Sequence, residues 1–211
     1  MNSRKNLLIW MCVPVSLLLL ALASGCGPSL KYTVPQETIQ RLPKGSRRTV
    51  FQARTVVTIA VDRKASIRRK IEATIQEIEK TKKKIESAKK ESSKYLGLEL
   101  AMLDAKVDFL EDSVKHQETL LELADYELML AKAQFELAKA KLVKKHSIAF
   151  DADIQDFEEQ VKSVGEYVQR FKKGVDAEAA ELKIEEDKWL AAKKTYYSAI
   201  GESSKGWWTE Q

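Results

Sequence analysis

The feature that most constrains the fold of this chain is the placement of its prolines. All 4 prolines occur at or before Pro43, in a chain of 211 residues. Because proline removes a backbone donor and clashes with the preceding helical turn, a long stretch without it suits uninterrupted helices. Composition agrees, since Ala, Glu, Lys, Leu and Arg are abundant and only 8% of residues are aromatic. The region after Pro43 is therefore expected to be helical.

Apolar residues in that region recur at alternating intervals of three and four, as in a helix that packs through one apolar stripe. Three such registers follow one another and predict helices over residues 46–93, 97–145 and 152–200. The first two registers differ in phase by one residue, and the slip falls in the segment 92–97. At about 1.5 Å per residue, each helix would be roughly 70 Å long.

Matching helix lengths and short connections predict an all-α fold, a long antiparallel three-helix bundle or coiled coil. The second helix is apolar almost all round between residues 120 and 143, which indicates two neighbours. The first helix is strongly basic and the other two are acidic, and this favours pairing within one molecule. The alternative is that the first two helices continue as one through Gly97, since glycine lowers helix propensity without forbidding a helix.

A signal-like segment precedes the helices. It has a basic start, an apolar stretch over residues 7–23 and small residues before Cys26. These are the features of a secretory signal rather than of a fold element. The apolar stretch is shorter than the ~20 residues of a membrane-spanning helix, and Pro14 interrupts it.

The run Leu22-Ala23-Ser24-Gly25-Cys26 resembles the lipobox of bacterial lipoproteins, although Ala23 stands where Leu, Val or Ile is usual. The resemblance implies cleavage between Gly25 and Cys26 and covalent lipid, including palmitate, on Cys26. Several acyl chains on one residue make a stable anchor. Because Gly27 is not the Asp that retains many lipoproteins at the inner membrane, the resemblance implies the outer membrane, facing the periplasm. The alternatives are an uncleaved anchor and an ordinary signal peptide with an incidental cysteine.

The predicted layout is a signal peptide (1–25), a lipid-anchored flexible tether (26–45), the helical bundle (46–200) and a C-terminal tail (201–211). The tether is expected from its content of proline and glycine. Of the 2 cysteines, the resemblance implies that Cys12 leaves with the signal and that Cys26 carries lipid. No disulfide, thiol nucleophile or cysteine zinc cluster is therefore expected.

The sequence contains no recognisable catalytic constellation, so no enzyme, metal or cofactor is expected beyond the covalent lipid. Neither of the 2 histidines has a ligand partner three or four residues further on. Carboxylate groups such as those of residues 185–187 are expected to lie on solvated helical faces. Thr74, Gln117 and Glu178 occupy seam positions and are expected to form one polar layer that fixes the helix register.

Two features are candidates for partner binding. A lysine-rich run that includes Lys82, Lys83 and Lys84 ends the first helix. It is either a solvated helix end or a patch for an anionic polymer, a lipid head group or an acidic partner. In the tail, Trp207 and Trp208 either cap the bundle or anchor a partner or membrane surface. In an up-down-up bundle, both features share the end away from the anchor.

The expected function is that of a membrane-anchored lipoprotein, a non-enzymatic structural or adaptor rod in the bacterial cell envelope. Its expected partners are an envelope protein or an anionic envelope polymer, and not nucleic acid. Residues 126–143 also resemble the helical hairpins of envelope efflux and adaptor proteins. The alternative is a periplasmic chaperone-like binding module, which would need exposed apolar stripes between helices. The sequence leaves the oligomeric state open.

Overall fold

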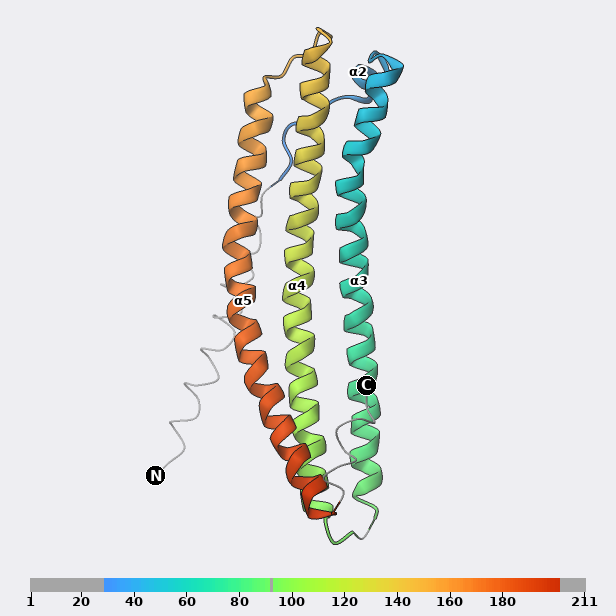
Figure 1. Ribbon diagram of the computed structural model, residues 1–211, viewed down its shortest axis with the longest axis vertical. Coiled ribbons are helices and arrows are strands. Elements are labelled where there is room, and N and C mark those ends of the chain that lie inside the picture. The colour runs from blue at the N-terminus through green and yellow to red at the C-terminus, as the bar shows by residue number, and fades with distance from the viewer. Residues whose placement is uncertain (1–28, 92, 202–211) are drawn as a thin grey trace, which may run out of the picture. The chain divides into compact units, whose positions relative to one another are not determined.

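The computed structural model describes residues 29–91 and 93–201. Its contacts divide the chain into Met1–Lys31 and Tyr32–Gln211, and the helices belong to the second unit. They are α2 (Gln36–Gln40), α3 (Lys44–Ala88), α4 (Leu96–Lys145) and α5 (Ile154–Ala199) (Figure 1). The prediction of an all-α helical bundle is confirmed, and within the described ranges there is no strand. In the same ranges, no helix has the length and apolar character to cross a membrane.

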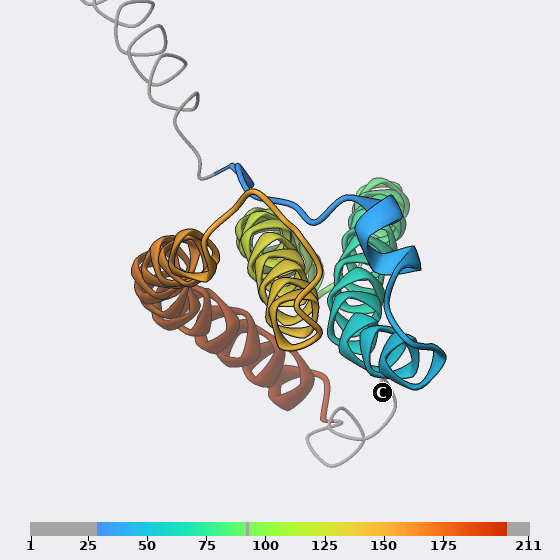
Figure 2. The ribbon, with the colours of Figure 1, turned by 90° about the horizontal axis from the view of Figure 1, so that it is seen from above.

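The helix α4 lies between α3 and α5 and forms extensive contacts with both (Figure 2). It runs antiparallel to each, so the chain reverses direction twice and goes down, up and down again in the view of Figure 1. Leu123, Ala124 and Ala131 are among its buried residues. The central position explains why the apolar surface of residues 120–143 extends almost all round this helix.

The reversal between α3 and α4 excludes one continuous helix through Gly97. The helix α3 ends at Ala88, earlier than the predicted residue 93, and backbone bonds of the turn type follow it. The hydroxyl of Ser93 then accepts a hydrogen bond from the backbone N–H of Tyr95, at 3.2 Å. Serine side chains that bond to nearby backbone groups in this way favour turns over helix. The chain therefore reverses close to the predicted phase slip.

The connection between α4 and α5 is stabilised by a helix cap on each side. After α4, Ser147 adopts a left-handed conformation with φ 52°, and the N–H of Ile148 donates to the carbonyl of Val143 at 3.2 Å. This arrangement is a Schellman-type C-cap. Before α5, the carboxylate of Asp153 accepts a hydrogen bond from the N–H of Gln155 at 3.3 Å, an N-cap that places the start of the helix.

The segment over residues 32–42 is packed against the bundle, which corrects the predicted flexible tether of residues 26–45. The side chains of Val34 and Leu42 are only 4% and 1% exposed. They belong to one buried cluster with residues from α3, α4 and α5. Burial of these apolar side chains offsets the conformational entropy that a tether would keep.

Hydrogen bonds hold the start of this segment in place. The backbone N–H of Tyr32 donates to Oε1 of Gln160 at 2.9 Å, and Nε2 of Gln160 donates to the carbonyl of Tyr32 at 3.1 Å. The proline content of the predicted tether is typical of a linker. Instead, Pro35 and Pro43 stand immediately before α2 and α3. A backbone N–H at that position would not take part in a helical hydrogen bond, so proline is tolerated there.

Charged side chains join α3 to α4, as the contrast in charge between the two helices predicts. Arg63 lies 2.7 Å from Glu127, and Lys64 pairs with Asp125. Exposed ion pairs of this kind contribute about 0–1 kcal/mol each. They set the pairing of the helices more than the stability of the fold.

The expected polar layer forms only in part. Nε2 of Gln117 donates to the hydroxyl of Thr74 at 3.1 Å, which joins α4 to α3. Glu178 is exposed and approaches Nδ1 of His116 at 3.8 Å instead. His116 and Gln117 are neighbours on α4 and face different helices, so the prediction of one layer that contains all three residues is wrong.

Candidate functional site

A cavity of about 570 Å³ lies among the C-terminal part of α3, the N-terminal part of α4 and the C-terminal part of α5. We call it the tip pocket, because the helix ends that line it are opposite to the end of the bundle that holds α2 (Figure 1). The last buried residue of α5 is Val175. Beyond it, α5 leans across α4 (Figures 1 and 2). Loose packing of the final turns of α5 therefore leaves room for the pocket.

Positive charge dominates the lining of the tip pocket, with 5 lysines against 2 glutamates. The lysines come from three different helices, so the fold brings together charges that are far apart in the sequence. A concave surface lined by one sign of charge concentrates counter-ions and oppositely charged ligands. The lysines are Lys80, Lys83, Lys84, Lys106 and Lys193, and the glutamates are Glu91 and Glu99.

Glu77 offsets part of this charge from a position beside the pocket. Its carboxylate accepts a hydrogen bond from Nζ of Lys106 at 2.8 Å and lies 3.9 Å from Nζ of Lys80. The bond from Lys106 is the main cause that holds the pKa of Glu77 below its ordinary value. Glu77 is therefore ionised near neutral pH, and it orients Lys106 within the pocket wall.

An indole ring forms part of the wall. Trp189 stacks on Phe109 with ring centroids 5.4 Å apart and planes 9° from parallel. Nζ of Lys106 lies 5.9 Å, and Nζ of Lys193 5.5 Å, from the centroid of the Trp189 ring. At such distances a cation is attracted to an aromatic face. Trp189 thus joins the charged part of the pocket to its apolar part.

Two tyrosines continue the aromatic wall towards the end of α5. The rings of Tyr196 and Tyr197 meet edge to face, with centroids 5.2 Å apart. Met102 and Ile200 add apolar surface beside them. Tyrosine offers both a ring face and a hydroxyl, so this part of the pocket suits a ligand with apolar and hydrogen-bonding groups.

The structure divides the predicted lysine run between two faces of α3. Lys83 and Lys84 line the tip pocket. Nζ of Lys82 instead lies 2.9 Å from Oε1 of Glu111, and this hydrogen bond is the main cause that raises the pKa of Lys82. Successive residues of a helix point about 100° apart. Lys82 therefore lies outside the surface that Lys83 and Lys84 share.

The other predicted site residues lie outside the described residues. They are Gly25 and Cys26 at the expected cleavage and lipidation site, and Trp207 and Trp208 in the tail. Their roles stay predictions.

Sequence reasoning missed most of the pocket wall. Trp189 and Tyr196 continue the apolar register of the third predicted helix, which by itself indicates only a helix seam, and Lys106 and Lys193 belong to no motif. One signal was present: 3 aromatic residues fall within residues 189–197, in a chain with few aromatic residues. The crossing of α5 over α4, which turns this cluster into a pocket wall, has no marker in the sequence.

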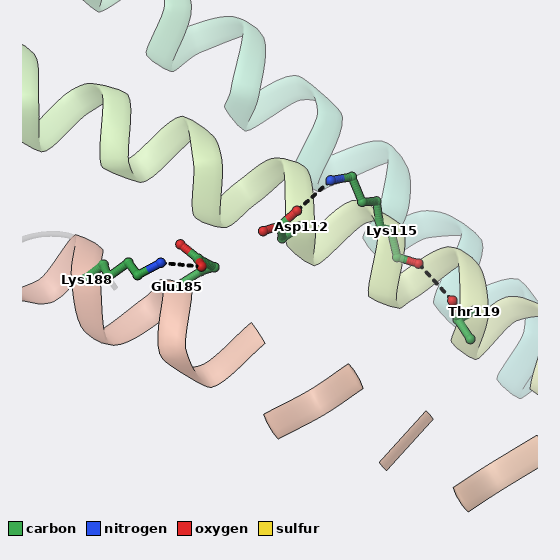
Figure 3. A network of polar contacts seen from close by, with 5 residues as sticks. All are labelled: Asp112, Lys115, Thr119, Glu185 and Lys188. Atoms are coloured by element: carbon green, nitrogen blue, oxygen red, sulfur yellow. Dashed lines mark hydrogen bonds and ion pairs between the residues drawn. The ribbon is translucent and has the colours of Figure 1, made fainter. Parts of the chain in front are cut away.

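Some carboxylates on the nearby helix surfaces pair within their own helix. Figure 3 shows Glu185 paired with Lys188 at 2.6 Å and Asp112 paired with Lys115 at 2.6 Å. The hydroxyl of Thr119 donates to the backbone carbonyl of Lys115 at 3.2 Å. Each of these contacts joins two residues of the same helix, which is typical of a solvated helix surface. Among the residues with described positions, no three His, Cys, Asp or Glu side chains are grouped so as to hold a metal ion.

No protein-family model, curated protein or solved structure matches this chain.

Proposed function

We propose that this protein is a lipid-anchored adaptor rod of the bacterial cell envelope that holds a partner at its tip pocket and has no enzymatic activity. The observation that carries the proposal is that the tip pocket lies far along α5 from the segment that follows the proposed lipid anchor. The segment that begins at Tyr32 is fixed near the start of α5, through Gln160. The tip pocket includes Trp189, close to the other end of α5. At about 1.5 Å per residue, Gln160 and Trp189 are roughly 40 Å apart along the helix.

The pocket chemistry favours recognition over catalysis. Lysine and aromatic side chains attract anions and provide the rings on which binding energy is commonly concentrated. The partner is an envelope protein with an acidic surface or an anionic envelope polymer. Cys26 supplies the anchor through its lipid, and the outer membrane, on its periplasmic face, is the proposed location.

Labelling cells with palmitate tests the anchor. The wild-type chain and a Cys12→Ser variant are expected to incorporate the label, because Cys12 lies within the proposed signal peptide. A Cys26→Ser variant is expected to incorporate none. Equal labelling of the Cys26→Ser variant and the wild-type chain contradicts the proposal. Cys12→Ser is the matched control, since it removes the only other thiol.

A second candidate function, a chaperone-like binding module, is favoured by one observation. The first half of α3 exposes large apolar side chains: Phe51 is 69% and Ile59 62% exposed. Exposed apolar surface of this kind is typical of sites that bind proteins. If this function is correct, the purified chain slows aggregation of an unfolded client and a Phe51→Ser/Ile59→Ser variant does not. An Ile184→Ser variant on α5 is the control, because Ile184 is also exposed.

A further inference from the structure

We propose that the tip pocket binds a phosphorylated sugar, with the lysines on the phosphate and the aromatic rings on the sugar. This inference deepens the proposed function and rests on it for the place where such a ligand is met. The ligand class follows from three properties of the pocket: its charge, its rings and its size.

The charge of the pocket matches one phosphate group. Among the described residues that line the pocket, with Glu77 added, positive charges exceed negative charges by two. A phosphate monoester carries about −1.5 to −2 at neutral pH. Lysine binds phosphate as a compact point charge and does not need the planar geometry that arginine imposes. Lys83 and Lys84 on α3 line the same cavity as Lys193 on α5, so one phosphate is within reach of ammonium groups from two helices.

The aromatic wall indicates what the phosphate is attached to. Trp189, Tyr196 and Tyr197 line the cavity beside the lysines. A sugar ring has an apolar C–H face that packs on such rings and hydroxyl groups that bond to tyrosine hydroxyls and lysine ammonium groups. An inorganic anion would use only the lysines and would leave the rings in water. The mixed wall therefore favours a ligand that is anionic on one side and a polar ring on the other.

The size of the pocket supports a ligand larger than an isolated anion. A volume of about 570 Å³ lies within the range of roughly 300–1,000 Å³ that is typical of small-molecule sites. One phosphate ion fills a small part of that space. A phosphorylated disaccharide, with a phosphate and two rings, uses the lysines and the aromatic wall together.

Binding to the full-length chain in a detergent without a sugar head group tests the proposal. The probes are trehalose 6-phosphate, trehalose and inorganic phosphate. In a chain with Trp10, Trp207 and Trp208 replaced by Phe, the fluorescence of Trp189 reports on the pocket alone. Trehalose 6-phosphate is expected to bind with a Kd lower than that of either other probe by about tenfold or more. A Kd no lower than that of inorganic phosphate overturns the sugar assignment, and no binding of either phosphate overturns the proposal.

Matched lysine variants locate the binding site. Lys83→Gln/Lys84→Gln is expected to raise the Kd for trehalose 6-phosphate by about tenfold. Lys89→Gln/Lys90→Gln makes the same change in charge just beyond the end of α3, at residues that do not line the pocket, and is expected to leave the Kd unchanged. Equal effects of the two variants would show that only the net charge matters and would contradict the pocket assignment. Circular dichroism checks that both variants keep their helical content.

The aromatic wall has its own test. Tyr197→Leu is expected to reduce the preference for trehalose 6-phosphate over inorganic phosphate and to leave the affinity for inorganic phosphate unchanged. Equal losses for both ligands would contradict the assignment of the sugar to the rings.

Two further experiments identify the source of the ligand and test the pocket independently of the lipid anchor. Vesicles that contain a phosphorylated glycolipid are compared with a soluble phosphorylated polysaccharide, and tighter binding of one identifies a lipid head group or a polymer. A purified Cys26→Ser chain is expected to bind trehalose 6-phosphate as the wild-type chain does. Absence of palmitate on Cys26 would thus refute the anchor alone, and absence of binding would refute the pocket ligand alone.

Discussion

The two ends of the helical bundle are built differently. At the end that holds α2, which we call the packed end, Phe157 is 0%, Leu42 1% and Val143 1% exposed. At the tip pocket, α5 has no buried residue beyond Val175, and a cavity lies beside α3 and α4, which stay packed together there through buried residues such as Ile85 and Leu103. Both ends belong to the same three long helices, so the difference arises from what is added to them.

An additional segment closes the packed end. Residues 32–42 contribute Val34 and Leu42 to a cluster with Phe157, and the apolar surface of α4 is covered there. At the tip, lysines on α3, α4 and α5 face one another, and like charges oppose closure. The contribution of α5 to stability therefore comes mainly from the packed end, and its last turns at the tip are assigned to binding.

The largest expected effect is that of Phe157→Ala at the packed end. Removing a fully buried ring leaves a cavity and is expected to lower the free energy of unfolding by about 3–5 kcal/mol. Leu190→Ala, on the same helix near the tip, removes a side chain that is 41% exposed and is expected to cost at most about 0.5 kcal/mol. Urea unfolding followed by circular dichroism measures both. Similar losses would remove the distinction between the ends.

The next effect concerns the attachment of the segment over residues 32–42. Gln160→Ala removes both side-chain hydrogen bonds to the backbone of Tyr32 and is expected to cost about 1–3 kcal/mol. Hydrogen exchange at the amide of Tyr32 is expected to accelerate. Gln155→Ala, which loses one exposed side-chain contact, is the control. Unchanged exchange in the Gln160→Ala variant would show that this segment is held by burial alone.

A smaller and opposite effect is expected at the turn that closes the packed end. Ser147 has φ 52°, a conformation that glycine adopts without steric cost. Ser147→Gly is expected to leave stability unchanged or to raise it by up to about 1 kcal/mol. Ser147→Ala keeps a β-carbon and is expected to gain nothing. Thermal unfolding compares the two variants, and a lower Tm for Ser147→Gly would contradict the assigned C-cap.

The smallest expected effect on stability is at the tip. Lys83→Gln/Lys84→Gln removes two charges from the pocket wall and is expected to change the free energy of unfolding by less than about 0.5 kcal/mol. The variant is nevertheless expected to lose partner binding. Urea unfolding and a crosslinking pulldown on the same samples test this pair of outcomes. A large loss of stability would make the tip a structural element rather than a binding surface.

The sequence predicted the helices because their apolar periodicity is local. The apolar registers that predict the helices contain residues that are buried in the structure: Val50 and Ile85 on α3, Val107 on α4 and Val164 on α5. The predicted start of α4 at residue 97 and its end at 145 differ from the observed bounds by one residue at most. A repeat of three and four residues needs no tertiary information to be recognised.

The packing of residues 32–42 and the tip pocket needed information that periodicity does not contain. Prolines near Val34 and Leu42 resemble those of a linker, and only contact with Phe157 shows that these residues are buried. Likewise, Trp189 has the same register whether α5 stays aligned with α4 or leans across it. The angle between two helices depends on side chains along the whole interface, so the pocket was not predictable from a motif.

The central claim, that partners are held at the tip and not at the packed end, is tested most directly by photocrosslinking in living cells. A photoreactive residue is placed at Tyr197 in the tip pocket or at Glu158, an exposed position on α5 near the packed end. Crosslinked products are then isolated from the membrane fraction. The account predicts a discrete product from position 197 that the Lys83→Gln/Lys84→Gln change abolishes, and none from position 158. The same product from both positions, or from position 158 alone, would contradict it.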